Sequence, residues 1–339
     1  MPEAVVIAEP RGQDSLGQGT VSSAFSGTEK WSFPAGVELL GESVTARLFQ
    51  ELDRAGMEDR SLLVHSNLAT HSFDLPKNVG TYLAPDVCGA ALQRLLDAQA
   101  KGVNAVILAR ASSYVDLDFA DFLQFHLASG ESVTRVWDEE QGPLDLWVVD
   151  PASFTEKDDL ISRLQDACSS YRIRTYVNRL ENLQDARRLV VDGLTGRCGF
   201  RPQGSEARPG VWIADGAEVK REARIVAPAF IGRDVKIADQ CLITRCSNIE
   251  SDSHIDYGTV VEDSSVLSGT YVGIGLDLSH SIADGVILQN LNYDVAVEIM
   301  DPVVMRSLRQ NKNRGDRNRQ WLDFRRAEVG ISEATNETT

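Results

Sequence analysis

The chain has 339 residues, of which 42% are hydrophobic, so it can bury a sizeable core and divide into two domains. Its net charge of −16 argues against a nucleic acid as a main partner. The five cysteines show no pairing spacing and no C-x-x-C motif, which is typical of reduced thiols in the cytosol. No apolar run approaches the length of a membrane span, so we expect a cytoplasmic protein.

Residues 1–203 alternate predicted strands with predicted helices, which indicates a doubly wound α/β domain. The first strand, at 4–8, is a continuous apolar run, and a loop rich in Gly and Ser follows it. Ligands gather at the carboxyl ends of strands in open α/β sheets, so this loop is either a binding loop or a plain surface loop. The other expected elements are strands at 61–65, 103–109, 133–137, 146–149 and 172–177, and helices at 44–55, 90–100, 119–127, 156–168 and 182–191.

A six-residue period governs residues 213–272. An interior that accepts one aliphatic and one small side chain in every six residues indicates a hexapeptide β-helix of short parallel strands. Sixty residues give about three coils, and 281–288 is expected to add part of another. The aliphatic series is Ile213, Val219, Ile225, Ile231, Ile237, Ile243, Ile249, Ile255, Val261 and Leu267, and the mostly small series is Ala217, Ala223, Ala229, Val235, Cys241, Ser247, Ser253, Thr259, Ser265 and Tyr271.

This period resembles that of the hexapeptide-repeat family, whose coils are triangular and left-handed. The resemblance alone implies the left hand, because parallel crossovers in general favour the right hand. It predicts a left-handed parallel β-helix over 204–292, and the Gly and Pro residues of 197–210 mark the boundary before it. Each coil stacks only on its neighbours, so the flanking chain must cover both ends.

The end of the chain, 293–339, is predicted to be a basic helical segment followed by a disordered tail. Residues 306–326 hold eight Lys or Arg against two Asp. This segment is either a solvated helix lying on the acidic body of the protein or a basic docking segment. The last nine residues have the composition of a disordered end.

An α/β domain followed by a hexapeptide β-helix resembles the sugar-phosphate nucleotidyltransferases, in particular mannose-1-phosphate guanylyltransferase-like proteins. The resemblance implies a nucleotidyltransferase-like (Rossmann-like) fold, a place in nucleotide-sugar or polysaccharide biosynthesis, and a homo-oligomer through the β-helix or a complex with a catalytic relative. The phrases that carry it are ELLGESVTARLFQEL at 38–52, VDLDFADFLQFH at 115–126, YVNRLENLQDARRL at 176–189 and PGVWIADGAEVKREARIVAPAFIG at 209–232.

The phosphate-binding loop of that family is degenerate in this chain. Relatives carry Gly-x-Gly-x-Arg after the first strand, and this chain has no such motif. A lone Gly-x-Gly is a weak signal of phosphate binding. The candidates that the loop still offers are Arg11, Gly12, Gly17 and Gly19.

The lysine and the two metal-binding aspartates of the family also lack counterparts. Counted from matched neighbours, the lysine position falls on Pro34, and the aspartate positions fall on Ser112 and Arg179. A serine is a poor ligand for Mg²⁺ without carboxylates beside it, and an arginine repels the metal. The resemblance therefore implies a site without its metal ligands.

Other polar residues of the chain are expected to cap a helix, to pack in the core or to act as a base. Asp116 and Asp118 precede a helix, where aspartate commonly caps the first N–H groups. His126 is expected to be a packed helix residue. His254 and His280 lie on or near the β-helix, where a histidine base would suit a hexapeptide acyltransferase.

The sequence thus favours a pseudoenzyme that binds a nucleotide sugar or sugar phosphate. Arg179 could face the phosphates in place of Mg²⁺, so no cofactor is expected. One alternative is an active sugar-1-phosphate nucleotidyltransferase with a rebuilt site, which would need Mg²⁺. The others are a hexapeptide acyltransferase and a purely structural oligomer held by the β-helix.

Overall fold

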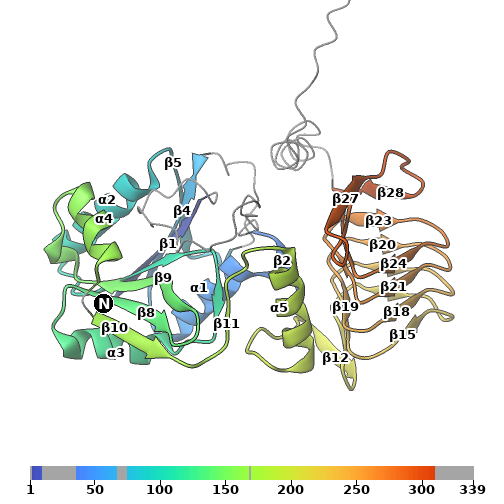
Figure 1. Cartoon of the computed structure of the whole chain (residues 1–339), viewed down its shortest axis with the longest axis horizontal. Coiled ribbons are helices and arrows are strands. Elements are labelled where there is room, and N and C mark those ends of the chain that lie inside the picture. Colours follow the sequence, from blue (N-terminus) through green and yellow to red (C-terminus); the bar gives the residue numbers. More distant parts are fainter. Residues whose placement is uncertain (1, 10–35, 67–74, 168, 310–339) are drawn as a thin grey trace, which may run out of the picture.

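A computed structural model of the chain describes residues 2–9, 36–66, 75–167 and 169–309. An α/β half and a strand-rich half lie side by side, with helix α5 (Leu183–Thr195) between them (Figure 1). None of the helices in these ranges has the length and hydropathy that crossing a membrane requires.

A seven-stranded sheet forms the centre of the α/β half. Its order is β10-β8-β9-β6-β1-β4-β5, and all neighbours are parallel except the two pairings of β9. The chain runs outward from β1 to β4 and β5 and then returns to β6 on the other side of β1, so the order reverses there. The strands are β1 (Glu3–Ala8), β4 (Asp59–His65), β5 (Val79–Ala84), β6 (Val106–Arg110), β8 (Val133–Asp138), β9 (Gly142–Val149) and β10 (Ser169–Ile173).

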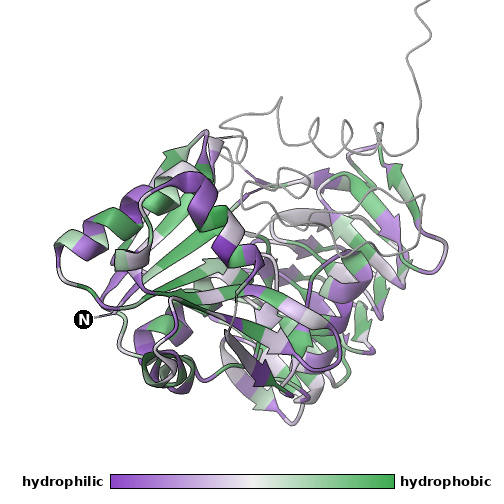
Figure 2. Cartoon of the chain, turned by 60° about the vertical axis from the view of Figure 1, so that its left-hand side comes forward, coloured by the Kyte–Doolittle hydropathy of each residue, from purple (hydrophilic) through white to green (hydrophobic). Residues whose placement is uncertain are grey.

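Helices cover both faces of this sheet, as the alternating pattern predicted. Phe49 and Phe122 bring α1 and α3 onto one face, and Leu95 and Leu164 bring α2 and α4 onto the other. Figure 2 shows the hydrophobic strands lying between these helical layers. The helices are α1 (Val44–Arg54), α2 (Val87–Ala100), α3 (Phe119–Ser129) and α4 (Lys157–Gln165).

Several short strands were not predicted, and they matter for the site. The single strand expected at 172–177 is in fact two, because the chain leaves the sheet after β10 and pairs again elsewhere. Two-residue strands carry too few positions for a periodic signal. They are β2 (Glu38–Leu39) paired with β3 (Glu42–Ser43), and β7 (Tyr114–Val115) paired with β11 (Val177–Asn178).

Residues 211–284, here called the coil, form three parallel sheets whose strands alternate in strict rotation along the chain, consistent with a helix-like β fold (Figure 1). The coil completes four turns and begins a fifth with β25, one turn more than predicted. Its strands are β13 (Val211–Ile213), β14 (Glu218–Val219), β15 (Arg224–Ile225), β16 (Ala229–Ile231), β17 (Lys236–Ile237), β18 (Leu242–Thr244), β19 (Ser247–Ile249), β20 (His254–Ile255), β21 (Val260–Glu262), β22 (Ser265–Val266), β23 (Thr270–Val272), β24 (Asp277–Ser279) and β25 (Ser281–Asp284).

The six-residue phase holds as far as Val261 and then slips by one residue. Eighteen positions separate Ile231 from its partner Ile249, but only seventeen separate Ile249 from Val266. Val266 therefore takes the interior place predicted for Leu267, which packs instead against the α/β half. The prediction that Leu267 lies inside the coil is wrong.

The small series slips in the same way. Ser264 and Thr270, rather than Ser265 and Tyr271, are the residues whose amides bond to a hydroxyl of the preceding turn. A shorter corner causes the slip: Arg245 and Cys246 both have positive φ at one corner, whereas Asp263 alone does at the next.

Beyond the coil, 293–309 contain strands and no helix, so the predicted helical segment is wrong over these residues. Residues of β27 pair with β26, and β28 pairs antiparallel with β23, so the strand-rich half continues past the predicted boundary at 292. The helix was inferred from charge, which carries no information about backbone pairing. Residues from 310 onward lie outside the described ranges. The added strands are β26 (Ile287–Asn290), β27 (Val295–Glu298) and β28 (Met305–Ser307).

Candidate functional site

The carboxyl ends of β1 and β6 meet where the strand order of the sheet reverses, which is the usual ligand-binding place in open α/β sheets. Glu9 directly follows β1, and Arg110 is the last residue of β6. The Arg110 Nη2 atom lies 2.8 Å from Glu9 Oε1, and their side chains are only 9% and 2% exposed. A buried ion pair therefore marks this edge of the sheet.

A second carboxylate, Asp145 on β9, joins this pair to another arginine. Arg110 Nη1 lies 3.3 Å from one Asp145 oxygen, and Arg135 Nη2 lies 3.2 Å from the other. Arg135 also donates from Nε to the Leu144 carbonyl at 2.8 Å. Burial lowers the pKa of Arg135; Asp145 opposes this effect, and the positive charges of Arg179 and Arg110 add to it. Three guanidinium groups therefore share one electrostatic environment.

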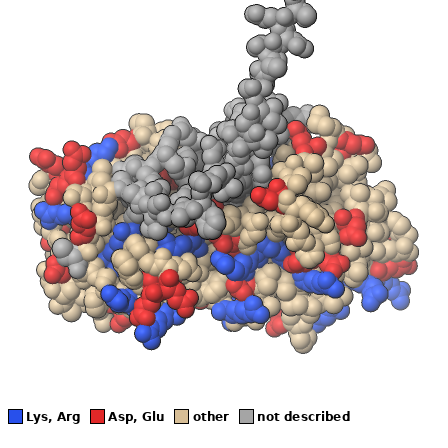
Figure 3. Space-filling model, viewed as in Figure 1, with Lys and Arg blue, Asp and Glu red and all other residues tan. Residues whose placement is uncertain are grey.

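Arg179 reaches the turn between β8 and β9 from the end of β11. Its Nη2 donates to the carbonyls of Gln141 at 2.8 Å and of Gly142 and Pro143 at 3.2 Å, and its Nε donates to Gln141 Oε1 at 3.1 Å. These bonds fix a charge that is partly exposed. Figure 3 shows Lys and Arg side chains gathered on this face over β9 and α5. We call the group the arginine cluster, and it consists of Glu9, Arg110, Arg135, Asp145 and Arg179.

The small β7–β11 ladder brings Ser112 and Arg179 to the same place. Tyr114 pairs with Asn178 in this antiparallel ladder, so its next step sets position 113 opposite Arg179. The Ser112 amide donates to the Arg110 carbonyl at 2.8 Å, which ties it to the end of β6. The two positions assigned by resemblance to metal-binding aspartates therefore lie just beyond the same end of this ladder, Arg179 one residue after Asn178 and Ser112 two residues before Tyr114.

These residues do not fit a Mg²⁺ ion. At the two assigned positions stand a hydroxyl and a guanidinium, and the nearby carboxylates Glu9 and Asp145 are engaged by arginines. A hard cation needs several free oxygen ligands and is repelled by fixed positive charge. In the ranges that the structure describes, no group of three or more His, Cys, Asp or Glu side chains is placed to hold a metal ion.

The candidate phosphate-binding residues of the loop after β1 lie outside the part of the chain that the structure describes. Arg11, Gly12, Gly17, Gly19 and Pro34 lie outside the described residues, so their places relative to the arginine cluster stay predictions. Sequence reasoning missed Arg110, Arg135 and Asp145. The signal available for Arg110 was a charged residue ending an apolar strand, VILAR, at the carboxyl edge where ligands gather.

The two aspartates before α3 have different roles. Asp118 is the N-cap, as predicted, and its side chain accepts from the amides of Ala120 and Asp121 at 3.0 Å. Asp116 is not a cap, contrary to the prediction. It accepts from the Gly199 amide at 2.9 Å and from the Tyr114 hydroxyl at 2.5 Å, and so ties the turn after α5 to β7.

Two of the candidate histidines are packing residues. His126 is buried with Nδ1 2.8 Å from Thr134 Oγ1, and burial lowers its pKa. His254 meets the ring of Tyr271 edge to face, and the guanidinium of Arg306 covers that ring at 3.5 Å from its centre.

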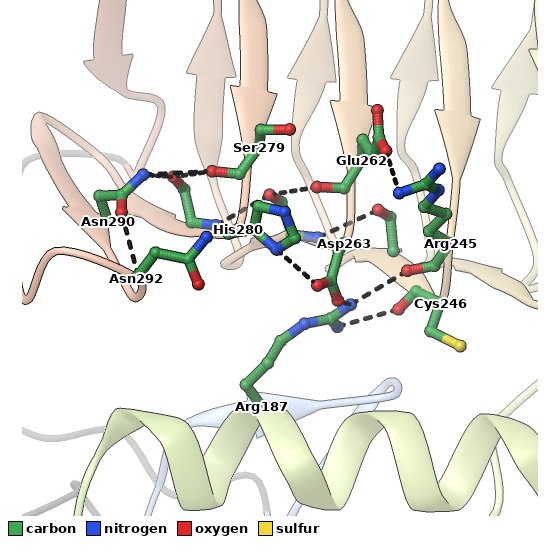
Figure 4. A network of polar contacts seen from close by, with 12 residues as sticks. Arg187, Arg245, Cys246, Glu262, Asp263, Ser279, His280, Asn290 and Asn292 are labelled. Atoms are coloured by element: carbon green, nitrogen blue, oxygen red, sulfur yellow. Dashed lines mark hydrogen bonds and ion pairs between the residues drawn. The ribbon is translucent and has the colours of Figure 1, made fainter.

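The third candidate histidine, His280, lies at the junction between the two halves (Figure 4). Its Nδ1 lies 2.7 Å from one oxygen of Asp263, whose other oxygen accepts from Arg187 of α5 at 2.8 Å. Arg187 also donates to the carbonyls of Cys246 at 2.9 Å and Arg245 at 3.3 Å, and burial lowers its pKa. His280 therefore shares its carboxylate with a structural arginine, which argues against the acyltransferase alternative.

A second anchor joins the coil to the turn between β2 and β3. Glu250 is fully buried and accepts from the amides of Leu40 at 2.8 Å and Gly41 at 2.9 Å, and from the Asn248 amide group at 2.5 Å. Burial raises the pKa of Glu250 to about 8, and the charge of nearby Glu38 acts in the same direction. A carboxyl group of the coil therefore holds the backbone that leads into α1.

Gly41 is required in this turn for two reasons. Its φ of +87° is one that side chains rarely adopt. An added Cβ would also lie 2.9 Å from Gln203 Cβ and 3.0 Å from Phe230 Cζ. The close approach of the turn to the coil thus depends on a glycine.

The raised pKa of Glu250 gives stability a definite pH dependence. The folded protein keeps this proton until about pH 8, whereas the unfolded chain loses it near pH 4.5. The unfolding free energy contributed by Glu250 is therefore full below pH 4.5 and falls as the pH rises to about 8. Between these two pH values the fall amounts to about 1.4 kcal/mol for each tenfold drop in proton concentration.

We expect Glu250→Gln to flatten this fall, as measured by urea unfolding at pH 5 and pH 8.5. Glu262→Gln is the matched control, because Glu262 lies in the coil but is partly exposed and paired with Arg245. An equal pH slope in wild type and Glu250→Gln would contradict the assignment.

No protein-family model matches this chain, and no curated protein matches its sequence.

Proposed function

We propose that this protein is a catalytically degenerate, sugar-phosphate nucleotidyltransferase-like protein of the cytoplasm that binds a nucleotide sugar. It serves as a regulatory or assembly subunit in nucleotide-sugar or polysaccharide biosynthesis. The observation that supports this proposal most is that Ser112 and Arg179 follow the same end of the β7–β11 ladder, with a guanidinium fixed by hydrogen bonds at a position where the resemblance implies a metal ligand.

The architecture supports the fold part of this proposal. A sheet whose strand order reverses at β1, with helices on both faces, suits nucleotide binding at its carboxyl edge. The coil that follows has the strand rotation and the inward aliphatic series of a hexapeptide repeat. On this basis we propose that a nucleotidyltransferase-like domain is joined to a left-handed β-helix.

The charges of the arginine cluster support the ligand part. Three arginines against Glu9 and Asp145 leave a formal surplus of one positive charge beside the loop that follows β1. Guanidinium forks match phosphate oxygens in geometry and keep their charge at every physiological pH. A diphosphate can therefore bind here without a metal.

The same charges explain why the bound ligand does not react. Transfer of a nucleotidyl group needs divalent metal to neutralise charge that develops on the leaving pyrophosphate. Arg179 carries a single charge and is held by three carbonyls, so it cannot coordinate two reacting oxygens at once as a divalent metal does. The assembly part of the proposal follows the resemblance, with a second copy or a catalytic relative as partner through the coil.

We expect GDP-mannose to bind in the presence of EDTA and Arg179→Ala to weaken that binding by about tenfold or more, because a charged hydrogen bond contributes about 1.5 to 3 kcal/mol. Titration calorimetry measures both. Arg174→Ala is the matched control: Arg174 is five residues away, 82% exposed and paired only with Glu139 in the described ranges. Its loss should leave the affinity unchanged.

Turnover separates this proposal from the active-enzyme alternative. We expect no pyrophosphate release from any NTP with mannose-1-phosphate or glucose-1-phosphate and Mg²⁺ above the background without protein. Release at ordinary enzyme rates that EDTA abolishes would establish the active enzyme. Equal binding by wild type and Arg179→Ala would remove Arg179 from the site.

A further inference from the structure

One sheet of the coil continues beyond the other two and leaves part of the interior open. Strand pairing places Val266, Ala283, Leu288 and Val297 in one column on successive strands β22, β25, β26 and β27. The first three pack in or against the core of the coil, whereas Val297 is 48% exposed. The other two sheets end at β24 and β28, and Val295 and Val297 on the inner side of β27 are about half exposed.

More apolar side chains surround this opening. The β26–β27 hairpin and the segment after it expose Tyr293, Val295, Val297, Met300 and Val303, which we call the end face. A large exposed apolar patch usually marks a contact surface, and an unpaired edge strand invites another segment to cover it. The exposed acidic residues Asp294, Glu298 and Asp301 lie in the same segment, and Asp294 and Glu298 point to the side of β27 opposite Val295 and Val297, so the acid borders the apolar side chains.

The chain itself arrives beside the end face. The Arg309 Nη2 atom lies 2.8 Å from Asp284 Oδ1, and its Nε donates to the Ser268 carbonyl at 2.8 Å. Asp284 ends β25, which is two strands from β27, a distance of about 10 Å. The thirty residues that follow Arg309 therefore start within easy reach of the opening.

The composition of those thirty residues complements the end face. Trp321, Leu322 and Phe324 are three large apolar residues in four positions. The basic residues are confined to the part that holds these three side chains: 310–326 have six Lys or Arg against two Asp, whereas 327–339 have three Glu and no Lys or Arg. We propose that residues 310–339 cover the end face of their own chain, with Trp321, Leu322 and Phe324 against Val295 and Val297.

A second copy of the chain is a poorer occupant. A twofold contact between two end faces would bring the exposed Asp294, Glu298 and Asp301 of both copies to the rim of one interface. Like charges across an interface oppose association. The basic segment carries the required opposite charge, and its covalent attachment supplies a high local concentration.

Hydrogen exchange on the full-length protein tests this proposal. We expect Trp321→Asp/Phe324→Asp to speed exchange of the β27 amides by about tenfold or more, since a charged side chain in place of a buried aromatic one favours the open state of the covering segment. Val329→Asp/Ile331→Asp is the matched control, with the same added charge in the same segment. Exchange in β1, at the far end of the molecule, serves as the internal reference in both proteins.

The outcomes are distinct. Faster β27 exchange in the first variant alone, independent of protein concentration, supports the proposal. Equal β27 exchange in wild type and both variants overturns it. Protection of β27 that grows with protein concentration and ignores both variants assigns the end face to a second copy, and this also overturns it.

Discussion

Replacing Ile237 by aspartate should lower the free energy of unfolding by more than about 4 kcal/mol, the largest effect that we expect of a substitution in the coil. Ile237 is 1% exposed and lies in the column between Val219 and Ile255 of the neighbouring turns. An aspartate there must be buried without a partner or drive its own strand apart. Urea unfolding followed by circular dichroism measures the loss.

The adjacent residue gives the control. Lys236 lies on the same strand but points to solvent, beside Glu218 and His254 of the neighbouring turns. Lys236→Asp should change the free energy of unfolding by less than about 0.5 kcal/mol. Comparable losses at 236 and 237 would show that the interior phase of the coil is wrong.

Removal of the Arg187 guanidinium should cost about 2 to 3 kcal/mol and loosen the junction between the two halves. Its side chain is 7% exposed and pairs with Asp263, while its other donors reach carbonyls of the coil corner at Cys246 and Arg245. Arg187→Ala removes the donor to these part-buried carbonyls and the arginine partner of Asp263. Arg187→Lys should recover only part of the loss, because an ammonium group cannot match the fork.

Arg188→Ala is the control on the same helix. Arg188 is 57% exposed and pairs with Asp185 within α5, so its loss should cost less than about 1 kcal/mol. Chemical unfolding gives the energies, and hydrogen exchange along α5 and the corner at 245–246 shows where the structure loosens. Similar losses for Arg187→Ala and Arg188→Ala would mean that the buried network does not hold the halves together.

Periodicity in the sequence predicted the repeating parts of the fold and missed the shorter corner at Asp263. The alternation of strands and helices and the interior residues from Ile225 to Val261 follow from local patterns, and the structure has them. The corner at Asp263 is one residue shorter than the corner before it, and such a difference leaves no trace in a six-residue count. Because of that corner, Val266 and not Leu267 lies inside the coil.

The site was harder to predict because its residues are distant in sequence. Ser112 and Arg179 were found by counting from matched neighbours, and their closeness comes from a ladder of two-residue strands. Arg110, Arg135 and Asp145 meet only because β9 runs antiparallel between β6 and β8. An antiparallel strand inside an otherwise parallel sheet has no local signal, so the contact of these three charges could not be foreseen.

The connection from the arginine cluster to the coil is short and stiff. Only three residues separate Arg179 from α5, and Asn178 braces them by donating to the Asp185 carbonyl and accepting from the Leu180 amide. Arg187, little more than one turn into α5, donates to the carbonyls of the coil corner at Cys246 and Arg245. If Arg179 binds the proposed ligand, a ligand that shifts Arg179 would weaken the contact of Arg187 with the coil corner, and a partner that changes that corner would alter the ligand affinity by the same factor.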